Sequence, residues 1–304
     1  MSFSSEVKQE LLKQYSKARH CQLAELAAIV AMEGHIDENG SLYIYTDNSA
    51  VVEKYTMLIK KLFQLDVTRA LTKEVTEKIL TALKLTENLA IASLLESEYS
   101  LQGVAVNGLL LQNTCCKRAF LRGVFLASGS ISDPRKSYHF EIVCHTKAQA
   151  EQIKEILEFF EGEPKIVRRN QRYVLYLKEG SQIVDSLNVM EAYVSLMNLE
   201  NIRIEKEMRN SINRQVNCET ANINKTVTAA VRQIQDIELI RDTGGLERLP
   251  ENLYEMAVCR LENPDTPLKD LGQLLDPPVG KSGVNHRLRK LSQLADQLRL
   301  GEQI

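Results

Sequence analysis

The chain has 304 residues, of which 44% are apolar, and 38 lysines and arginines stand against 40 aspartates and glutamates. This composition is typical of packed globular domains, and the length predicts roughly two of them. Because the formal charge is only −2, the chain as a whole is not a basic polyanion-binding protein. A nucleic-acid surface would need positive charge gathered on one face or in one domain.

No segment of the sequence predicts a membrane span or an export signal. The longest apolar run, 26–32, has seven residues, whereas a transmembrane helix needs about 20. Residues 2–13 mix charged and apolar side chains and lack the apolar core and cleavage site of a signal peptide. We therefore expect a cytoplasmic protein with no membrane partner.

The cysteines show no pattern typical of a metal or disulfide site. None forms a C-x-x-C pair, and the neighbours Cys115 and Cys116 are poor partners for a disulfide with each other. Cys144 and His145 adjoin in one expected strand, so their side chains should point to opposite faces. Ligand spacing is also absent for His35, His139 and His286. We expect buried, reduced thiols, no metal site and no cofactor; the other cysteines are Cys21, Cys218 and Cys259.

The first third of the chain predicts alternating helices and pairs of strands. Apolar residues recur at helical spacing up to Gly34, a residue type that can close a helix in the left-handed conformation. Asn48 is a typical cap for the next helix. The expected elements are a helix over 21–33, strands at 35–36 and 42–46, a helix to about 65, strands near 67–71 and 78–83, and a helix over 87–97.

The same order of elements returns in the second third of the chain. Gly34 and Gly129, which end the two first helices, are 95 positions apart. The expected elements are a helix over 115–127, strands at 130–132 and 138–145, a helix over 147–160, strands at 165–169 and 173–177, and a helix from about 181. The chain therefore contains an internal duplication of an α-β-β-α-β-β-α unit.

Both repeats contain a nine-residue segment that resembles the motif of the LAGLIDADG homing endonucleases. The segments are LAAIVAMEG at 26–34 and LRGVFLASG at 121–129. Small residues along each helix allow two helices to pack closely about a pseudo-two-fold axis; they are Ala24, Ala28, Ala31, Ala119, Gly123 and Ala127. The resemblance implies two four-stranded sheets that extend from this axis as a saddle, with a concave face that the family lays along DNA.

The residues that carry cleavage in this family are incomplete here. In active enzymes of the family, the acidic residue before the last glycine of each motif holds a divalent metal at the scissile phosphates, and two carboxylates are needed. The corresponding residues are Glu33 and Ser128, and a hydroxyl is a poor ligand for Mg²⁺. Asp133, followed by Pro134, fits a turn better than a metal site. We expect vestigial positions and no enzymatic activity, with a residual metal-dependent DNA endonuclease as the alternative.

The last third of the chain predicts helices only. Helices are expected over 191–199, 205–214 and 225–241, and the polar run 213–222 predicts a helix–helix junction, or alternatively a phosphate or interdomain contact. After a break at 243–245, three helices are expected at 251–261, 268–275 and 282–298. A short helix, a turn with glycine and a longer basic helix together form a helix-turn-helix.

The last of these helices is typical of a DNA-recognition helix. Its apolar stripe consists of Val284, Leu288, Leu291, Leu294 and Leu298, and the segment 281–290 has four basic residues and no acidic one. The candidate DNA-binding residues are Lys281, Ser282, Asn285, His286, Arg287, Arg289 and Lys290. Secondary candidates bracket a hairpin with Asn170 and Gln171 at its tip, and they are Lys165, Arg168, Arg169 and Arg172.

Four segments, at 2–8, 121–134, 213–222 and 268–291, together resemble the WhiA family over essentially the whole chain. The resemblance implies a nuclease-inactive LAGLIDADG-like domain joined to a helix-turn-helix domain similar to a sigma-factor promoter-reading domain. It also implies a transcriptional regulator of cell division, chromosome segregation or sporulation in Gram-positive and related bacteria.

The expected organisation is an α+β protein with a duplicated LAGLIDADG-like saddle followed by an all-α helix-turn-helix domain. The expected boundaries are 1–200 for the saddle, with repeats at about 20–100 and 114–198, then 201–224 for a helical linker and 225–304 for the DNA-binding domain. We expect a monomer associated with the nucleoid that binds double-stranded DNA. Transcription machinery and division proteins are further candidate partners, and a protein-interaction platform in division is the remaining alternative function.

Overall fold

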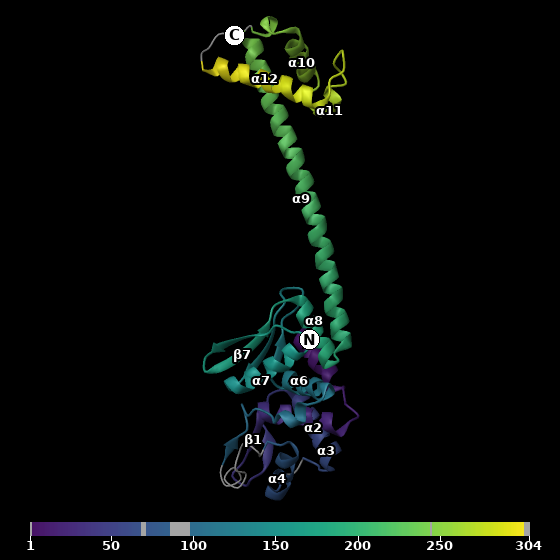
Figure 1. Ribbon diagram of the computed structural model, residues 1–304, viewed down its shortest axis with the longest axis vertical. Helices are drawn as coiled ribbons and strands as arrows, with labels where there is room; N and C mark the ends of the chain where they lie inside the picture. Colours follow the sequence, from purple (N-terminus) through teal and green to yellow (C-terminus); the bar gives the residue numbers. More distant parts are fainter. Residues whose placement is uncertain (1, 68–70, 86–97, 244, 301–304) are drawn as a thin grey trace. The chain divides into compact units, whose positions relative to one another are not determined.

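The computed structural model describes residues 2–67, 71–85, 98–243 and 245–300, and its ribbon is shown in Figure 1. The chain divides into two compact units, Met1–Glu207 and Met208–Ile304. None of the described helices is long and apolar enough to cross a membrane.

The first unit contains two α/β repeats behind a short N-terminal helix. Its first part comprises α1 (Phe3–Leu12), α2 (Arg19–Glu33), β1 (Gly34–Ile36), β2 (Leu42–Ile44), α3 (Ser49–Phe63), α4 (Lys73–Ala82), β3 (Tyr99–Ser100) and the 3-10 turn η1 (Gly108–Leu111). Its second part comprises α6 (Thr114–Ser128), β4 (Gly129–Ile131), β5 (Phe140–Cys144), α7 (Lys147–Phe159), β6 (Lys165–Arg169), β7 (Arg172–Leu177) and α8 (Gly180–Met190).

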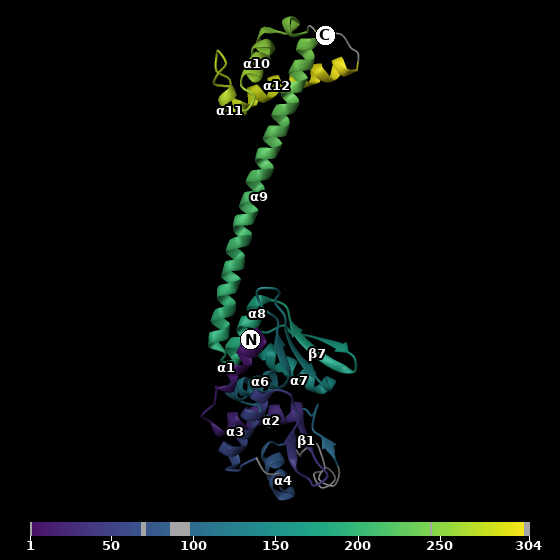
Figure 2. The same cartoon turned by 180° about the vertical axis from the view of Figure 1, so that it is seen from behind.

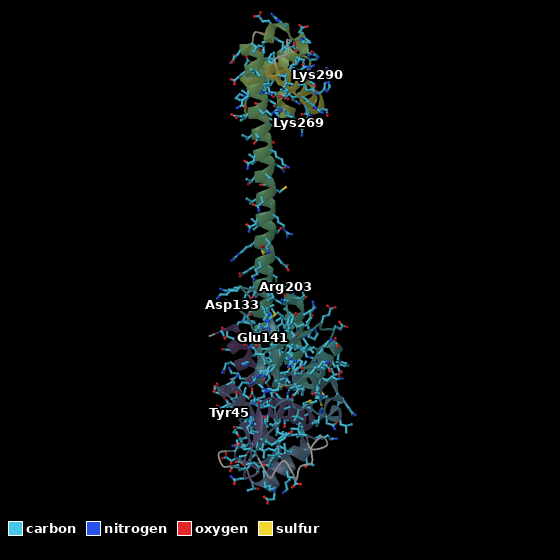
Figure 3. All side chains as sticks on the ribbon, turned by 90° about the vertical axis from the view of Figure 1, so that its left-hand side faces the viewer. Tyr45, Asp133, Glu141, Arg203, Lys269 and Lys290 are labelled. Atoms are coloured by element: carbon cyan, nitrogen blue, oxygen red, sulfur yellow. The ribbon has the colours of Figure 1, made fainter. Side chains whose placement is uncertain are left out.

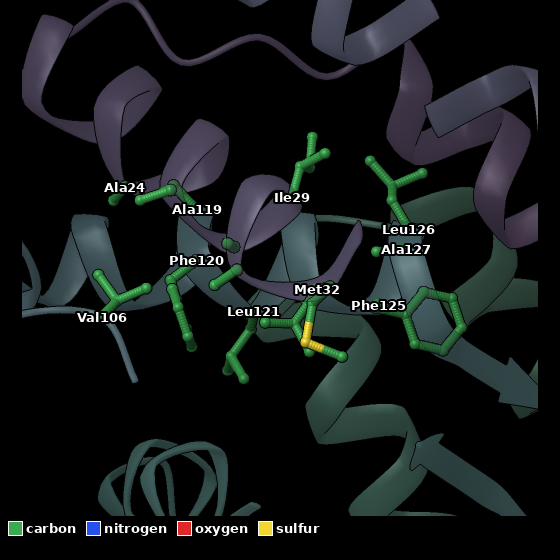
Figure 4. Close-up of a cluster of buried hydrophobic side chains, with 14 of the residues drawn as sticks. Ala24, Ile29, Met32, Val106, Ala119, Phe120, Leu121, Phe125, Leu126 and Ala127 are labelled. Atoms are coloured by element: carbon green, nitrogen blue, oxygen red, sulfur yellow. The ribbon is translucent and has the colours of Figure 1, made fainter. Parts of the chain in front are cut away.

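The two motif helices, α2 and α6, form the centre of this unit. Both are almost entirely buried, and Figure 4 shows side chains of the two helices, Ala24 and Phe120 among them, in one apolar cluster. A Cβ atom at Gly123 would lie 2.5 Å from the carbonyl oxygen of Glu25 and 2.8 Å from Cβ of Ala28. The close approach of the two helices therefore depends on glycine at this position, as the motif resemblance implies.

Gly34 and Gly129 end the motif helices for a reason other than the expected one. Both have extended backbone, with φ near −80°, instead of the left-handed conformation. A Cβ at Gly34 would lie 2.9 Å from Cγ1 of Val30, and one at Gly129 would lie 2.8 Å from Cα of Phe125. Glycine is needed here because the strand that follows turns back against the helix.

Each repeat contributes one antiparallel sheet. The described strands of the first repeat form a sheet in the order β2-β1-β3, and those of the second form a sheet in the order β4-β5-β7-β6. Figures 1 and 2 show β1 and β7 on the same side of the α2–α6 pair. The second repeat agrees with prediction element by element, and Asn170 and Gln171 form the hairpin tip with positive φ.

The first repeat differs from prediction in its second half. The strand expected at 78–83 is wrong, because this segment lies in and just after α4. Val75, Ile79 and Leu83 recur every four residues, which is a helical period, and Ile79 and Leu83 are fully buried. The strand expected at 67–71 falls mostly outside the described residues, and the helix expected at 87–97 falls entirely outside them. Three described strands form this sheet, where the motif resemblance implies four.

A buried ionic network ties the two repeats together. Glu25 of α2 accepts from Nζ of Lys54 at 3.1 Å and from Nε of Arg122 in α6 at 3.2 Å, and all three side chains are at most 1% exposed. Arg122 also donates to Glu191 at 2.6 Å and to Oγ of Ser16 at 2.8 Å. Lys54 donates further to the carbonyl oxygens of residues 11 and 14.

The helix α9 (Tyr193–Asp242) runs without a break through the polar segment 213–222. The junction expected there is wrong. The segment contains neither glycine nor proline, and its polar side chains bond within the helix: Gln215 donates to Glu219 at 3.0 Å, and Arg214 donates to the carbonyl of Asn210 at 3.3 Å. Bonds between residues four apart satisfy side chains that would otherwise favour a turn.

The second unit is an all-helical domain. It comprises the end of α9, the 3-10 turn η2 (Leu246–Arg248), α10 (Glu251–Glu262), α11 (Leu268–Leu271) and α12 (Lys281–Arg299). Its core brings together Ile237, Ile240, Met256, Leu271 and Leu288. The helix α11 is shorter than the expected 268–275, because the loop returns to it: N–H of Val279 donates to the carbonyl of Gly272 at 2.8 Å.

Candidate nucleic-acid interfaces

The C-terminal ends of α2 and α6 open into one cavity of about 830 Å³ in the first unit. Glu33 and Ser128, the last residues of the two motif helices, both line it, together with Lys8, Gln102, His145 and Arg172. The structure therefore brings together the two positions that the motif resemblance pairs, although they are 95 residues apart in the chain.

Only one of these two positions carries a charge. Nε2 of Gln102 lies 3.4 Å from Oε2 of Glu33. Burial raises the pKa of the Glu33 carboxyl, and the positive charges of Arg172 and Lys8 oppose that rise. Oγ of Ser128 is buried and has no hydrogen-bond partner. The two motif positions thus supply one carboxylate to the cavity, whose lining also includes Asp47, Lys8 and Arg172. Carboxylates and cations side by side suit an anion such as phosphate as much as a divalent metal.

The basic hairpin β6–β7 borders this cavity on the outer face of its sheet. Strand pairing places Lys165, Arg169 and Arg172 on one face, opposite the buried face that carries Ile142 and Leu175. Arg172 lines the cavity. Arg168 belongs to the other face, since side chains alternate along a strand. The structure therefore groups three of the four secondary candidates, all exposed, and separates Arg168 from them.

One acidic residue reduces the positive charge of this face. Glu141 lies 3.2 Å from Nε2 of His139 and 3.9 Å from Nη1 of Arg169. It also accepts from Oγ of Ser130 at 3.2 Å. By strand register, Glu141 lies in the same row as Lys165, with Tyr176 between them, whereas Arg172 pairs with Arg169 at the tip of the hairpin. The carboxylate therefore offsets part of the charge of Arg169, and Arg172 is the basic residue of this face that lines the cavity.

The outer face of the first-repeat sheet carries an aromatic group that sequence reasoning missed. The ring of His35 stacks on Tyr43 at 5.5 Å between centroids, and Tyr45 meets it edge-on at 6.4 Å. Tyr45 is 74% exposed and lines the cavity. The alternation of apolar residues and tyrosines over 42–45 is the signal that could have found this face. Exposed rings beside basic side chains are a common platform for bases of single-stranded nucleic acid.

The helix α12 exposes most of the predicted recognition residues. Val284, Leu288, Leu291 and Ala295 form its buried side, while Leu294 and Leu298 are only partly buried. The exposed residues are Lys281, Ser282, Asn285, His286, Arg289 and Lys290, and Figure 3 labels Lys290 on the surface of this unit. Arg287 differs, because it is half-buried and its Nη1 lies 3.4 Å from the carbonyl oxygen of Asn252 in α10.

A second basic group adjoins the N-terminus of α12. Lys281 lines a cavity of about 400 Å³ with Lys225 of α9 and Lys269 of α11. Lys225 and Lys269 lie 44 residues apart and were not among the predicted residues. Sequence reasoning missed them because only the packing of α9 and α11 in this unit brings them to Lys281. The N-terminal end of α12 therefore carries more positive charge than the sequence of this helix alone indicates.

The cysteines differ in part from the expected burial. Cys115 and Cys218 are exposed, whereas Cys21, Cys116, Cys144 and Cys259 are buried. The expectation that all six thiols are buried is therefore wrong. Asp133, in contrast, forms the expected turn: its Oδ1 accepts from N–H of Arg135 at 2.9 Å, and its carbonyl accepts from N–H of Lys136 at 2.9 Å.

Comparison with known proteins finds the same relatives for both units. The family model described as the WhiA LAGLIDADG-like domain matches residues 117–209, and the model of the WhiA C-terminal HTH domain matches residues 212–295. A probable cell division protein WhiA of Lachnoclostridium phytofermentans is 51% identical and covers 98% of this chain and 100% of its own length. The protein of the same name from Lachnospira eligens is 47% identical, with 98% of each chain covered. The crystal structure of full-length DUF199/WhiA from Thermatoga maritima has a TM-score of 0.58 at 24% identity, covers 98% of this chain and 99% of that chain, and shows the same fold.

Proposed function

Because the chain belongs to the WhiA family, we propose that it is a DNA-binding transcriptional regulator of cell division. The helix-turn-helix of the second unit supports DNA binding, and the relatives named as probable cell division proteins support the process in which it acts. Chromosome segregation and sporulation belong to the same proposal, as do a cytoplasmic, nucleoid-associated location and a monomeric state.

The observation that carries this proposal is the exposed face of α12. Ser282, Asn285 and Arg289 follow one another at intervals of three and four residues, so they share one side of the helix, turned away from the buried stripe of Val284 and Leu288. In a helix-turn-helix, residues near the N-terminus of the second helix contact base edges in the major groove. Asn285 and Arg289 have the side chains that read adenine and guanine there.

The basic group at the start of α12 would position the helix on the DNA backbone. Lys281, Lys225 and Lys269 gather beside the N-terminus, and Lys290 is exposed further along the helix. Lysine contacts with phosphates fix orientation without reading sequence. If these four lysines and Arg289 each neutralise one phosphate, the logarithm of affinity falls with a slope of roughly −4.5 against the logarithm of salt concentration.

The first unit would serve as a non-cleaving accessory surface for DNA. Arg172 and Lys165 offer phosphate contacts on the outer face of one sheet, and Tyr43 and Tyr45 offer aromatic rings on the other. Of the two motif positions that line the cavity, Glu33 supplies a carboxylate and Ser128 a hydroxyl, where two-metal cleavage uses two carboxylates. Binding without cleavage is therefore the activity that we assign to this unit.

The recognition face can be tested with a duplex selected by the full-length protein from a random pool. We expect Arg289→Ala to weaken binding of this duplex and to reduce the salt slope by about 0.9, as measured by fluorescence anisotropy at several salt concentrations. Lys154→Ala, on the exposed side of α7, is the charge-matched control and should leave both quantities unchanged. An unchanged slope for Arg289→Ala would contradict its assignment to a phosphate or base contact.

A plasmid assay tests the absence of cleavage. Supercoiled plasmid incubated with the protein and Mg²⁺ or Mn²⁺ should stay supercoiled over hours. Nicking that disappears in Glu33→Gln would show that the one remaining motif carboxylate supports hydrolysis, and the endonuclease alternative would replace our proposal.

A further inference from the structure

Four metal-ligating side chains meet at the N-terminal ends of the two motif helices. They are His20 and Cys21 of α2 and Cys115 and Cys116 of α6, and their ligand atoms all lie within 4.8 Å of one another. Nδ1 of His20 lies 3.1 Å from Sγ of Cys116 and 3.3 Å from Sγ of Cys21. Sequence reasoning expected no metal site, because no two of these residues within one segment have ligand spacing.

The four residues occupy equivalent positions in the two repeats of the chain. His20 and Cys115 are 95 positions apart, as are Cys21 and Cys116, and this is the same offset that relates Gly34 to Gly129. Each pair occupies the second and third positions of its helix, since α2 begins at Arg19 and α6 begins at Thr114. The pseudo-two-fold relation of the motif helices therefore brings two pairs together into one set of four.

We propose that His20, Cys21, Cys115 and Cys116 form a zinc site that fastens the two repeats to each other. Three sulfurs and one imidazole nitrogen are a donor set that Zn²⁺ takes in closed, tetrahedral structural sites. In such a site, bonds of about 2.3 Å to sulfur and about 2.0–2.1 Å to nitrogen set the ligand atoms roughly 3.5–3.8 Å apart. The distances around His20 lie close to this range, so the side chains need only small adjustments to bind the ion.

The surroundings of the four residues suit a site of net negative charge. Two helix N-termini converge here, and neither Ala18 nor Asn113 caps its helix through a side chain. The positive end of each helix dipole therefore favours negative charge at the cluster.

A metal ion can reach the four ligands from solvent, because one side of the cluster is exposed. Cys21 and Cys116 are 3% and 2% exposed and form the inner side of the cluster, whereas His20 and Cys115 are exposed at its outer side. The four protein ligands leave no coordination position for a substrate, so the role is structural. Because the ligand pairs come from the two repeats, a bound ion would hold the helix ends that lie opposite the Glu33–Ser128 cavity.

The test is the zinc content of the full-length, untagged chain after dialysis against a chelator of moderate affinity, measured by mass spectrometry of the metal. We expect about one zinc ion per chain, as a four-ligand site binds, and thiolate-to-metal charge-transfer bands when cobalt replaces zinc. Mutation of a residue that only hydrogen-bonds to a zinc ligand lowers metal affinity by roughly 10–100-fold. His20→Ala and Cys115→Ser remove a ligand itself, so each should lower zinc affinity by more than this. Both residues are exposed, so these variants should retain the far-ultraviolet circular dichroism of the native chain.

Matched controls separate this site from unspecific thiol binding. Cys218→Ser removes another exposed thiol, on α9, and should keep the full zinc content. Zinc should also raise the thermal midpoint of the native chain and leave that of His20→Ala unchanged, because an ion that binds only the folded state stabilises it. The proposal is overturned if the native chain retains no zinc, if the two ligand variants retain as much as Cys218→Ser, or if two of the three cysteines of the cluster are found joined in a disulfide.

Discussion

The buried network around Glu25 allows a quantitative prediction. Glu25→Gln keeps the size of the side chain and removes the one carboxylate that contacts both Lys54 and Arg122. All three side chains are at most 1% exposed, so water cannot reach the two cations and solvate them in place of the lost carboxylate. Removing one partner from a buried ion pair leaves the other charge uncompensated, which costs about 3–5 kcal/mol.

The remaining contacts set where in this range the effect should lie. Arg122 keeps Glu191 at 2.6 Å, and Lys54 keeps the two backbone carbonyls to which it donates. The glutamine oxygen can still accept one hydrogen bond from either cation. We therefore expect a loss of about 3 kcal/mol, near the lower end.

Urea denaturation of the full-length chain measures this loss. The chain has no tryptophan, and nine of its ten tyrosines lie before residue 208, so tyrosine fluorescence follows the first unit. With a urea dependence of about 2–3 kcal/mol/M, the midpoint should fall by about 1 M or more. Glu151→Gln, which breaks the exposed pair with Lys147, is the control and should change stability by no more than about 0.5 kcal/mol. If the two variants unfold at the same urea concentration, the carboxylate of Glu25 does not compensate the two buried cations, and the reasoning fails.

Three further predictions follow from the packing and charge of the two units. Gly123→Ala should destabilise the first unit by about 1–3 kcal/mol in thermal or urea unfolding, because its Cβ would press against the backbone of Glu25; a gain of stability, as helix propensity alone predicts, would contradict the close contact. The raised pKa of Glu33 means that the folded state loses stability as this carboxyl ionises with rising pH. Glu33→Gln should therefore be more stable than the native chain at pH 7, and the difference should vanish below about pH 4, where the carboxyl is protonated in both states; an equal difference at both values would rule out ionisation as its cause. Lys225→Ala and Lys269→Ala should each reduce the salt slope of DNA binding by about 0.9, and slopes equal to that of Lys154→Ala would remove them from the interface.

Local patterns predicted most of the fold, and errors occurred where one pattern fits two structures. The second repeat could be predicted because its strands alternate cleanly and Thr146 and Asn170 occupy cap and turn positions. The segment that forms α4 contains β-branched and apolar residues, so that a short helix resembled a strand. In α9, asparagines favoured a turn by propensity, but the absence of glycine and proline decided the outcome.

The sites were predictable only where the residues are neighbours in the chain. The exposed face of α12 and the hairpin arginines follow from local spacing. The cavity around Glu33 required the motif resemblance, which pairs two distant helices. The stack of His35 on Tyr43 and the cluster around Cys116 depend on register and on packing between repeats, which a single segment does not encode. The internal offset of 95 residues was the signal that could have aligned the two cysteine-containing pairs.

The long helix α9 has a practical consequence for work on this chain. Every residue from 207 to 229 is exposed, so peptide bonds there are cut without first disrupting either apolar core. Trypsin cleaves after lysine and arginine, and this stretch contains Arg209, Arg214 and Lys225. A single nick should release two fragments that each keep their secondary structure, so limited proteolysis gives direct access to either half without redesigning a gene.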